Sequence, residues 1–426
     1  MGISKRVPGA LTALLLLTGG LLAPVPAQAA SIGAVHTTAA FDDDPEEGAP
    51  EDGLEDGLAL DAESYAKDFG VTAEEARTRL TAQSEYGRLV EEIEAAHPDI
   101  FAGSTVDHGG DFGLRVRFTG DQVPEKAAEL VKGAPAVTLE AGARYSLIEA
   151  EKIIDSTGTN LDTHGAVEGV FYDSTNEKFV LDMVGAATGD RSAEAVTASL
   201  RATLPASLPA EIRSAEIRLT PQSAADGQRG GLPMTSCTSG FSVRNASGVK
   251  GILTAGHCGN SQSYHYFGSS TWLATTFRSQ ARNATSDVQW HTRPSNLSYP
   301  RFHASSTSAT RTLTGRVVRS GQNGDYVCHR GKTTGYSCGT VSTISYRPTW
   351  SNACNGVTCS ATWIRVSGSG LKCYPGDSGG PWFNAYKAYG IYKGQSSTGT
   401  GTAGCNWAVY MAINYISNIN VSLLYG

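Results

Sequence analysis

The sequence predicts an α+β region followed by an all-β domain made of many short strands. Helical periodicity and glutamate both disappear near residue 222. From there to the end, short β-type runs alternate with Gly- and Ser-rich turns, as in sandwich and barrel folds. All eight cysteines lie in this second part, between Cys237 and Cys405. We call residues 61–225 the N-terminal region and residues 226–426 the C-terminal domain.

Residues 1–29 have the pattern of a signal peptide. Lys5 and Arg6 precede an apolar run over residues 10–23, and Ala27-Gln28-Ala29 supplies the small residues that a signal peptidase reads. The run is shorter than the roughly 20 residues that span a bilayer. We therefore expect cleavage after Ala29, a secreted extracellular protein, and no membrane partner.

Residues 30–60 predict a disordered acidic linker, because they combine low hydrophobicity with charge of one sign. Helical periodicity follows over 61–98. The rest of the N-terminal region predicts alternating strands and helices without a catalytic pattern. These are a strand at 112–120, a helix at 125–133, a helix at 146–156, a strand pair at 169–185, a helix at 191–204 and a strand at 215–220.

The net charge of −7 conceals two parts of opposite sign. The C-terminal domain has four acidic residues against 17 Lys and Arg, whereas residues 1–225 have 37 acidic residues against 17. Two such segments attract each other, although two independent domains with unrelated surface charge remain an alternative. The basic residues are scattered singly rather than clustered, so we expect no nucleic-acid partner.

The even number of cysteines in an exported chain indicates disulfides. The sequence lacks the paired Cys-x-x-Cys knuckles of a structural zinc site, and we expect neither a metal nor a cofactor. Spacing alone does not determine which cysteines pair.

The stretch CYPGDSGGPW (373–382) places Ser378 in a Gly-rich turn. A serine nucleophile needs a general base, and that base needs an orienting group. His257, in LTAGHCG, ends a β-type run beside Cys258, and a disulfide at Cys258 would hold its backbone rigid. Asp287 opens a β-type run between His257 and Ser378, and is the best placed of the four acids.

The same turn offers donors for an oxyanion. The N–H groups of Gly376 and Ser378 can point in one direction, and the absence of a side chain on Gly376 lets a substrate approach closely. Taken singly, each feature has a structural alternative. A lone histidine is most often structural, an isolated aspartate often lies in a solvated turn, and a Gly-rich stretch is often only a turn.

In combination, these motifs resemble the chymotrypsin-like serine proteases, and within them the secreted bacterial α-lytic protease/streptogrisin group. LTAGHCG is followed by an aspartate 30 residues after the histidine, and PGDSGGP places its serine 91 residues further on. VCHRGKTTGYSCGTV (327–341) resembles a disulfide loop of that group, and ADGQRGG (225–231) resembles the start of its mature enzymes. The resemblance covers residues 225–426, and the N-terminal region is similar to the group's pro-region more loosely.

This resemblance implies two six-stranded antiparallel β-barrels, with the catalytic residues in the cleft between them. The segment 410–418 has weak helical character and predicts a short C-terminal helix. By resemblance, His257 is the base, Asp287 orients it, and Ser378 is the nucleophile. The resemblance further implies the disulfides Cys237–Cys258, Cys328–Cys338 and Cys373–Cys405, which leaves Cys354 and Cys359 to close a small extra loop.

The expected function is that of a monomeric, secreted serine endopeptidase made as a zymogen and acting on protein or peptide substrates. In the group it resembles, the pro-region assists folding and blocks the cleft until it is removed, which gives residues 61–225 that role here. Two alternatives remain open. One is a non-catalytic binding module on the same double-barrel fold, and the other is an esterase that uses the same triad.

Two departures concern the nucleophile turn. Between Cys373 and Gly376 the chain has Tyr374 and Pro375, one residue fewer than the streptogrisins. The group has a positive residue after the cysteine at 328, paired with the aspartate beside the nucleophile, which is Asp377 here. This chain has His329 at that place, with Arg330 and Lys332 as substitute partners for Asp377.

A third departure concerns the wall of the specificity pocket, which we assign to Tyr374, Lys393, Gly394 and Gln395. The segment AYGIYKGQ (388–395) ends Lys-Gly-Gln where the group has Ser-Gly-Gly. Lys393 has three possible roles: to pair with Asp287, to face an acidic substrate side chain, or to extend to solvent. Gln395 is expected to narrow the pocket against large aromatic side chains. The sequence does not identify the residue preference or the physiological substrate.

Overall fold

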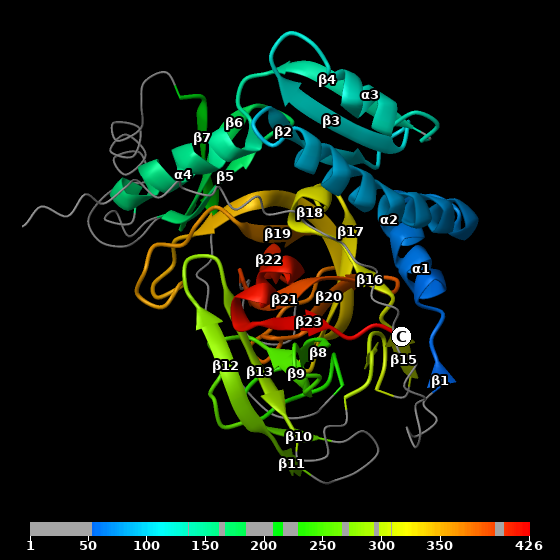
Figure 1. The fold of residues 1–426 in the computed structure, drawn as a ribbon, viewed down its shortest axis with the longest axis vertical. Coiled ribbons are helices and arrows are strands. Elements are labelled where there is room, and N and C mark those ends of the chain that lie inside the picture. Colours follow the sequence, from blue (N-terminus) through cyan, green and yellow to red (C-terminus); the bar gives the residue numbers. More distant parts are fainter. Residues whose placement is uncertain are drawn as a thin grey trace, which may run out of the picture. The chain divides into compact units, whose positions relative to one another are not determined.

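We describe the protein from a computed structural model (Figure 1). The described residues are 53–134, 136–161, 167–184, 208–215, 229–265, 272–293, 298–307, 309–396 and 404–426. All of them belong to one contiguous unit, Glu46–Gly426. The signal peptide, residues 30–52, the expected helix at 191–204, the boundary near residue 226 and nearly all of the expected strand at 215–220 lie outside the described residues.

The N-terminal region, together with residues 53–60 before it, has alternating helices and strands, as the sequence of the region predicts. The helices are α1 (Gly57–Phe69), α2 (Ala73–Ala96), α3 (Glu125–Leu130) and α4 (Leu147–Leu161), and the strands are β1 (Gly53–Leu54), β2 (Phe101–Asp107), β3 (Gly113–Thr119), β4 (Val137–Ala143), β5 (Val167–Asp173), β6 (Lys178–Val184) and β7 (Ala210–Ala215). The predicted strand at 112–120, the helices at 125–133 and 146–156 and the strand pair at 169–185 are confirmed, with ends shifted by a few residues.

The periodic segment 61–98 forms two helices rather than one. Gly70 has φ of 69°, the left-handed conformation that commonly ends a helix. Thr72 then caps α2, because its side chain accepts a hydrogen bond from the N–H of Glu75. The break between α1 and α2 therefore follows from Gly70 and Thr72, whose effect the hydrophobic periodicity of the segment does not reveal.

The boundary predicted for the disordered linker is wrong at its C-terminal end. Residues 53–60 form β1 and the first turn of α1, and the side chain of Asp56 caps α1 by accepting from the N–H of Ala59. β1 pairs in parallel with β15 (Ala309–Thr312), far along the chain. Composition did not reveal this ordered segment, because its stability comes from a distant partner strand.

The C-terminal domain consists of short strands with little helix. They are β8 (Ser242–Asn245), β9 (Lys250–Thr254), β10 (Ser263–His265), β11 (Trp272–Ala274), β12 (Thr276–Arg282), β13 (Asp287–Thr292), β14 (Arg301–Phe302), β15, β16 (Gly315–Arg316), β17 (Tyr326–Gly331), β18 (Gly335–Pro348), β19 (Trp363–Ser367), β20 (Pro381–Asn384), β21 (Lys387–Gln395), β22 (Trp407–Ala412) and β23 (Val421–Leu423), with the 3-10 helices η2 (Arg319–Gly321) and η3 (Ile413–Ile419). This agrees with the predicted all-β character.

One of the two expected six-stranded barrels closes in full. Strands β17, β20, β21, β22, β19 and β18 pair with one another in that order, and β18 pairs back with β17. The other set, β12-β13-β9-β8-β23, contains five strands among the described residues rather than six. We call these the six-stranded barrel and the five-stranded sheet.

The C-terminal helix is shorter and tighter than the sequence predicts. Strand β22 continues to Ala412, so only Ile413–Ile419 is helical, and it is a 3-10 helix. Asn420 ends it with φ of 57°. The apolar residues of 410–412 belong to a buried strand, which a short apolar run does not distinguish from a helix.

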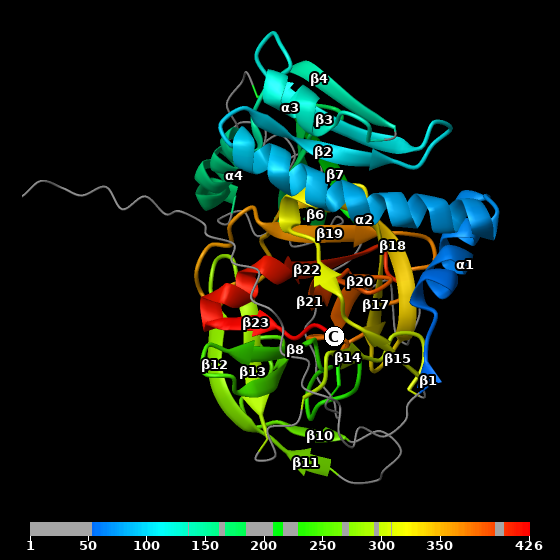
Figure 2. The ribbon, with the colours of Figure 1, turned by 45° about the vertical axis from the view of Figure 1, so that its right-hand side comes forward.

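Strand β18 joins the N-terminal region to the C-terminal domain. Its 14 residues extend beyond the barrel, and at its far end Arg347 pairs with Val170 and Pro348 with Gly169 of β5. Figure 2 shows β18 below the N-terminal strands β6 and β7. Strands β6 and β7 continue from β5, so that one sheet holds strands of both the N-terminal region and the C-terminal domain.

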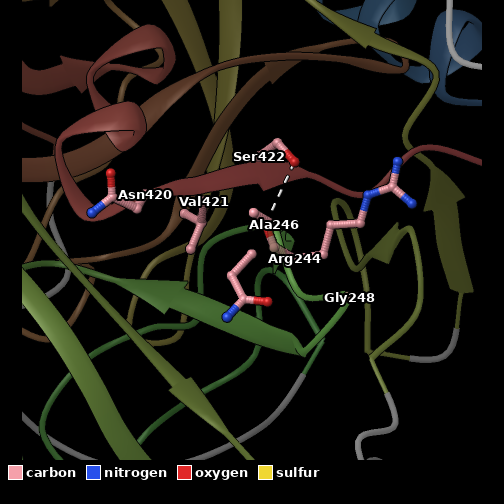
Figure 3. A pocket seen from close by; sticks show the side chains of 7 residues that line it. Arg244, Ala246, Gly248, Asn420, Val421 and Ser422 are labelled. Atoms are coloured by element: carbon pink, nitrogen blue, oxygen red, sulfur yellow. Dashed lines mark hydrogen bonds between the residues drawn. The ribbon is translucent and has the colours of Figure 1, made fainter.

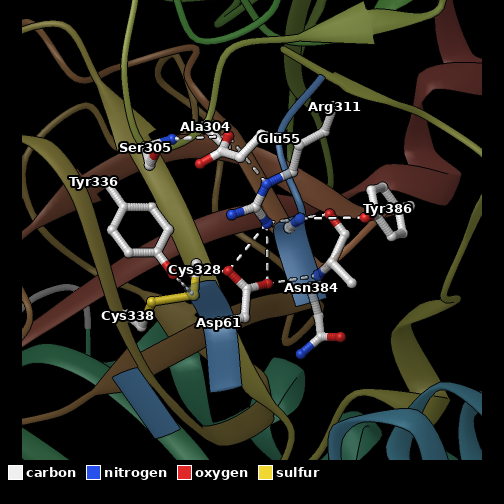
Figure 4. Close-up of polar contacts among 12 residues, drawn as sticks. Glu55, Asp61, Ala304, Ser305, Arg311, Cys328, Tyr336, Cys338, Asn384 and Tyr386 are labelled. Atoms are coloured by element: carbon white, nitrogen blue, oxygen red, sulfur yellow. Dashed lines mark hydrogen bonds and ion pairs between the residues drawn. A yellow bond between two sulfur atoms is a disulfide. The ribbon is translucent and has the colours of Figure 1, made fainter. Parts of the chain in front are cut away.

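Ion pairs also join the two halves, with the acid from residues before 226 and the arginine from the C-terminal domain. They are Glu55–Arg311, Asp61–Arg311, Glu91–Arg316, Glu151–Arg319 and Asp182–Arg365. Figure 4 shows the most buried of these, in which Arg311 and Asp61 are each 0 % exposed and 3.0 Å apart. Acidic residues of the negatively charged part of the sequence are thus paired with arginines of the positively charged part.

Buried apolar side chains from both halves share the same clusters. Tyr65 and Leu80 of the N-terminal region belong with Tyr326 and Phe383 of the six-stranded barrel. Among the residues described, no helix combines the length and the apolar character needed to cross a membrane.

Candidate active site

The turn that carries His257 follows strand β9 of the five-stranded sheet and is held from two sides. Cys258 forms a disulfide with Cys237. The side-chain N–H₂ of Gln289 donates to the carbonyls of Ala255, at 2.8 Å, and of Cys258, at 2.7 Å. These bonds bracket His257 in the chain, so they fix the backbone from which the imidazole projects.

Asp287 begins strand β13 and lies against this turn. Its carboxylate is buried, and the Oδ2 atom accepts a hydrogen bond from Nδ1 of His257 at 2.7 Å. A Cβ atom at Gly256 would lie 2.7 Å from the N atom of Val288, too close for a side chain. The glycine therefore lets the histidine turn approach the start of β13.

Ser378 lies in a turn that is fixed at each end. Gly376 and Gly379 have φ of 106° and 87°, which favour glycine. Thr238 donates from its hydroxyl to the carbonyl of Gly376 and from its N–H to the carbonyl of Ser378, each at 2.7 Å. Because Thr238 follows Cys237, the serine turn and the histidine turn are connected through one disulfide.

Asp377, beside the serine, is held by neutral donors. It accepts hydrogen bonds from the N–H groups of Thr333, Thr334 and Tyr374 and from the hydroxyl of Thr334. Arg330, an expected partner, instead donates to the carbonyls of Gly231 and Ala304. Burial raises the pKa of Asp377 to about 6, although these hydrogen bonds oppose the shift.

The expected oxyanion donors, the N–H groups of Gly376 and Ser378, have no hydrogen-bond acceptor among the residues that the structure describes. The hydrogen bond that would join Ser378 to His257 is not formed. The Nε2 atom of His257 is buried and has no hydrogen-bond partner within the described part of the chain. The structure thus joins His257 to Asp287 but does not show a hydrogen bond between Ser378 and His257.

Lys393 is buried and pairs with Asp287, the first of its three possible roles. Its Nζ atom lies 3.0 Å from Oδ2 of Asp287 and 2.6 Å from the carbonyl oxygen of Ala353. The side chain is only 4 % exposed, which contradicts the role in which it extends to solvent. Pairing of β21 with β22 shifts register between Tyr392 and Gly394, so Lys393 is the extra residue of a β-bulge.

Gln395 and Tyr374, the other side chains of the expected wall, differ in exposure. Gln395 is 3 % exposed, and its Oε1 atom accepts a hydrogen bond from the hydroxyl of Tyr392 at 2.7 Å. Tyr374 is partly exposed, and its N–H holds Asp377. The glutamine side chain is thus anchored inside the wall.

All eight cysteines are paired, in the combinations Cys237–Cys258, Cys328–Cys338, Cys354–Cys359 and Cys373–Cys405. These are the pairs that the resemblance implies, including the extra small loop. That loop contributes to a pocket of about 250 Å³ whose lining includes Trp350 and Ala353. A second pocket, of about 440 Å³, has no predicted site residue in its lining (Figure 3).

Sequence reasoning missed Thr238, Gln289 and the tryptophans beside Lys393. Gln289 was detectable in principle, because it lies two residues after Asp287 on one strand and therefore faces the same side. Thr238 offered a weaker signal, its position next to a disulfide cysteine. No sequence pattern predicts that Trp363 lies beside Lys393, because the two residues meet only in the folded protein.

A histidine–aspartate pair beside a glycine-framed serine defines the class that this site resembles, the chymotrypsin-like bacterial serine proteases. One relative is Streptogrisin-C of Streptomyces griseus, 29 % identical over 169 residues. The match covers 38 % of this chain and 32 % of that protein, so the chain spans about a third of the length of this curated relative. The predicted resemblance to the bacterial chymotrypsin-like serine proteases is therefore confirmed, whereas the looser resemblance of the N-terminal region to a pro-region stays a prediction.

Solved structures give similar matches. Thermobifida fusca protease A is 26 % identical, covering 47 % of this chain and 100 % of that one, with a TM-score of 0.37. The Nocardiopsis protease is 25 % identical, covering 46 % of this chain and 97 % of that one, with a TM-score of 0.34. No protein-family model matches the chain.

Proposed function

We propose that the protein is a secreted serine endopeptidase with a chymotrypsin-like site. The observation that carries this proposal is the 2.7 Å hydrogen bond from His257 to the buried Asp287, on a turn linked to that of Ser378. The similarity to bacterial serine proteases supports it. The N–H groups available at Gly376 and Ser378 suit the developing oxyanion of acyl transfer.

The mechanism begins at the Ser378 hydroxyl. Its Oγ atom attacks the carbonyl carbon of the peptide while Nε2 of His257 takes the hydroxyl proton. Asp287 keeps the other imidazole proton on Nδ1 and stabilises the imidazolium. His257 then gives its proton to the leaving amine, which leaves an acyl-enzyme, and a water attacks that ester by the same route in reverse.

The Ser378–His257 hydrogen bond is required for the first step but is absent from this structure. Catalytic hydrogen bonds are often long or misaligned without substrate and shorten in the Michaelis complex. Rotation of the serine side chain about its Cα–Cβ bond would move Oγ without moving the fixed turn.

A fluorophosphonate probe tests the proposal directly. We expect the mature enzyme to be labelled at Ser378 and to cleave a peptide library, and we expect Ser378→Ala to lose both. Absence of labelling in a folded protein would instead support the non-catalytic binding module. Labelling accompanied by turnover of esters but not of peptides would support the esterase.

We further assign residues 61–225 the role of a pro-region that aids folding and blocks the cleft. Two observations support this role: β5 pairs with the end of β18, and ion pairs join acids before residue 226 to arginines after it. Secretion is supported by the four disulfides, which form in oxidising compartments. Removal near residue 226 would leave a monomeric enzyme that acts on protein or peptide substrates.

A further inference from the structure

Lys393 places an ammonium group directly behind the His257–Asp287 pair. Besides the Asp287 carboxylate and the Ala353 carbonyl, the face of the Trp363 ring lies 4.2 Å from Nζ, measured to the ring centroid. A carboxylate, a carbonyl oxygen and an aromatic face all present negative potential, which is the environment of a bound cation. The site therefore suits a charged lysine.

His257 and Lys393 share one oxygen of Asp287. Oδ2 accepts from both, whereas Oδ1 is buried without a partner among the described residues. Arg282, which is paired opposite Asp287 in the register of β12 and β13, is a further positive charge that acts on Lys393. The Asp287 carboxylate thus contacts two basic side chains with one negative charge.

This arrangement has two consequences for the base. Lys393 fixes the orientation of the carboxylate, which keeps the proton of His257 on Nδ1. It also balances the carboxylate charge that would otherwise stabilise an imidazolium. A second positive charge on the imidazole, beside the same carboxylate, is therefore less favourable than it would be without Lys393.

We propose that Lys393 is a positioning residue that holds Asp287 and extends the working range of the enzyme toward acidic pH. The inference rests on the proposed function, because it concerns the base of that reaction. The inference goes beyond the proposed function, because it assigns control of the pH dependence to one further side chain, that of Lys393.

The ionisation of the pair agrees with this geometry. Burial lowers the pKa of Lys393, and the charge of Asp287 acts against that shift. Burial also acts to raise the pKa of Asp287, but His257 and Lys393 hold it well below its usual range. The lowered pKa of Asp287 agrees with an ionised carboxylate between the two basic side chains.

The test is the pH dependence of kcat/KM for a peptide substrate in Lys393→Met. Methionine keeps an apolar stem against Trp363 but removes the charge. We expect the midpoint of the acid limb to move upward by about one pH unit, a typical effect of a nearby charge on a titrating group. Lys387→Met removes the same charge from the partly exposed start of the same strand and should leave the midpoint unchanged.

An acid limb that stays in place in Lys393→Met, with Ser378 still labelled by the fluorophosphonate, would overturn the inference while leaving the proposed function intact. Failure of the wild-type protein to be labelled would overturn the proposed function first. These two results are distinguishable in one set of samples.

A second measurement covers the case in which Lys393→Met does not fold. In the full chain carrying Ser378→Ala and nitrogen-15-labelled lysine, NMR should show Lys393 as an ammonium across the pH range in which the wild type is active. Its deprotonation within that range would overturn the inference. Lys393→Arg provides the charge-preserving comparison, and we expect its acid limb to remain near that of the wild type.

Discussion

Asp377 illustrates how burial can outweigh hydrogen bonds in setting the pKa of a single residue beside the nucleophile. Its side chain is enclosed by neutral donors, and its pKa is raised by burial to about 6 from an ordinary value of 3.8. The folded state therefore binds this proton more tightly than the unfolded chain does. The stabilisation is fully present below about pH 4 and is lost as the pH rises through about 6.

Asp377→Asn should remove that pH dependence. In wild type, ionisation of this one group is expected to lower the free energy of unfolding by about 3 kcal/mol between pH 4 and pH 7. Denaturant unfolding at several pH values, with Ser378→Ala in both proteins to prevent self-cleavage, measures the difference. Parallel curves for the two proteins would contradict the assignment.

Among elements, helix α1 makes a fully buried polar contact with the C-terminal domain. Asp61 accepts from Arg311, from the hydroxyl of Tyr336 at 2.7 Å and from the N–H of Ala385 at 2.6 Å (Figure 4). Removing one partner of a buried pair leaves the other charge without compensation, which costs more than the pair itself contributes.

Asp61→Asn in the full chain should lower the free energy of unfolding by about 3 kcal/mol, because Arg311 would lose its closest counter-charge. Glu63→Gln is the matched control, since it removes the same charge from an exposed position of α1 and should have little effect. Chemical denaturation in a Ser378→Ala background gives both values. Equal losses in the two variants would show that the buried pair has no special role.

Local elements were predictable where their stability is local. The strand at 112–120 and the helix at 125–133 follow from period and propensity, and the triad candidates follow from motifs whose residues lie in short, rigid turns. The β1–β15 pairing, the Asp61–Arg311 pair and the place of Trp363 beside Lys393 join residues far apart in sequence. The sequence left three roles open for Lys393, because only tertiary packing decides where a flexible side chain ends.

For the molecule as a whole, the opposite charges of its two halves predict an association that depends on salt. Residues 30–225, expressed separately, should inhibit residues 226–426, with an inhibition constant that increases several-fold as salt is raised. The increase should be limited, because the Asp61–Arg311 pair is fully buried whereas the Glu91–Arg316 pair is largely exposed. Inhibition independent of salt would count against the electrostatic contribution.

Glu91→Gln in residues 30–225 provides the control for that experiment. It removes an exposed pair, so it should reduce the salt dependence and leave most of the inhibition at high salt.

The far end of β18 also bears on the solubility of the proposed mature enzyme. Once β5 departs, the last residues of this long strand become an open sheet edge, and open edges recruit strands from other molecules into aggregates. The final paired residue of that edge is Pro348, which has no N–H to offer a new neighbour. The proline that ends the shared strand would thus protect the released protease from edge-to-edge association with its own copies.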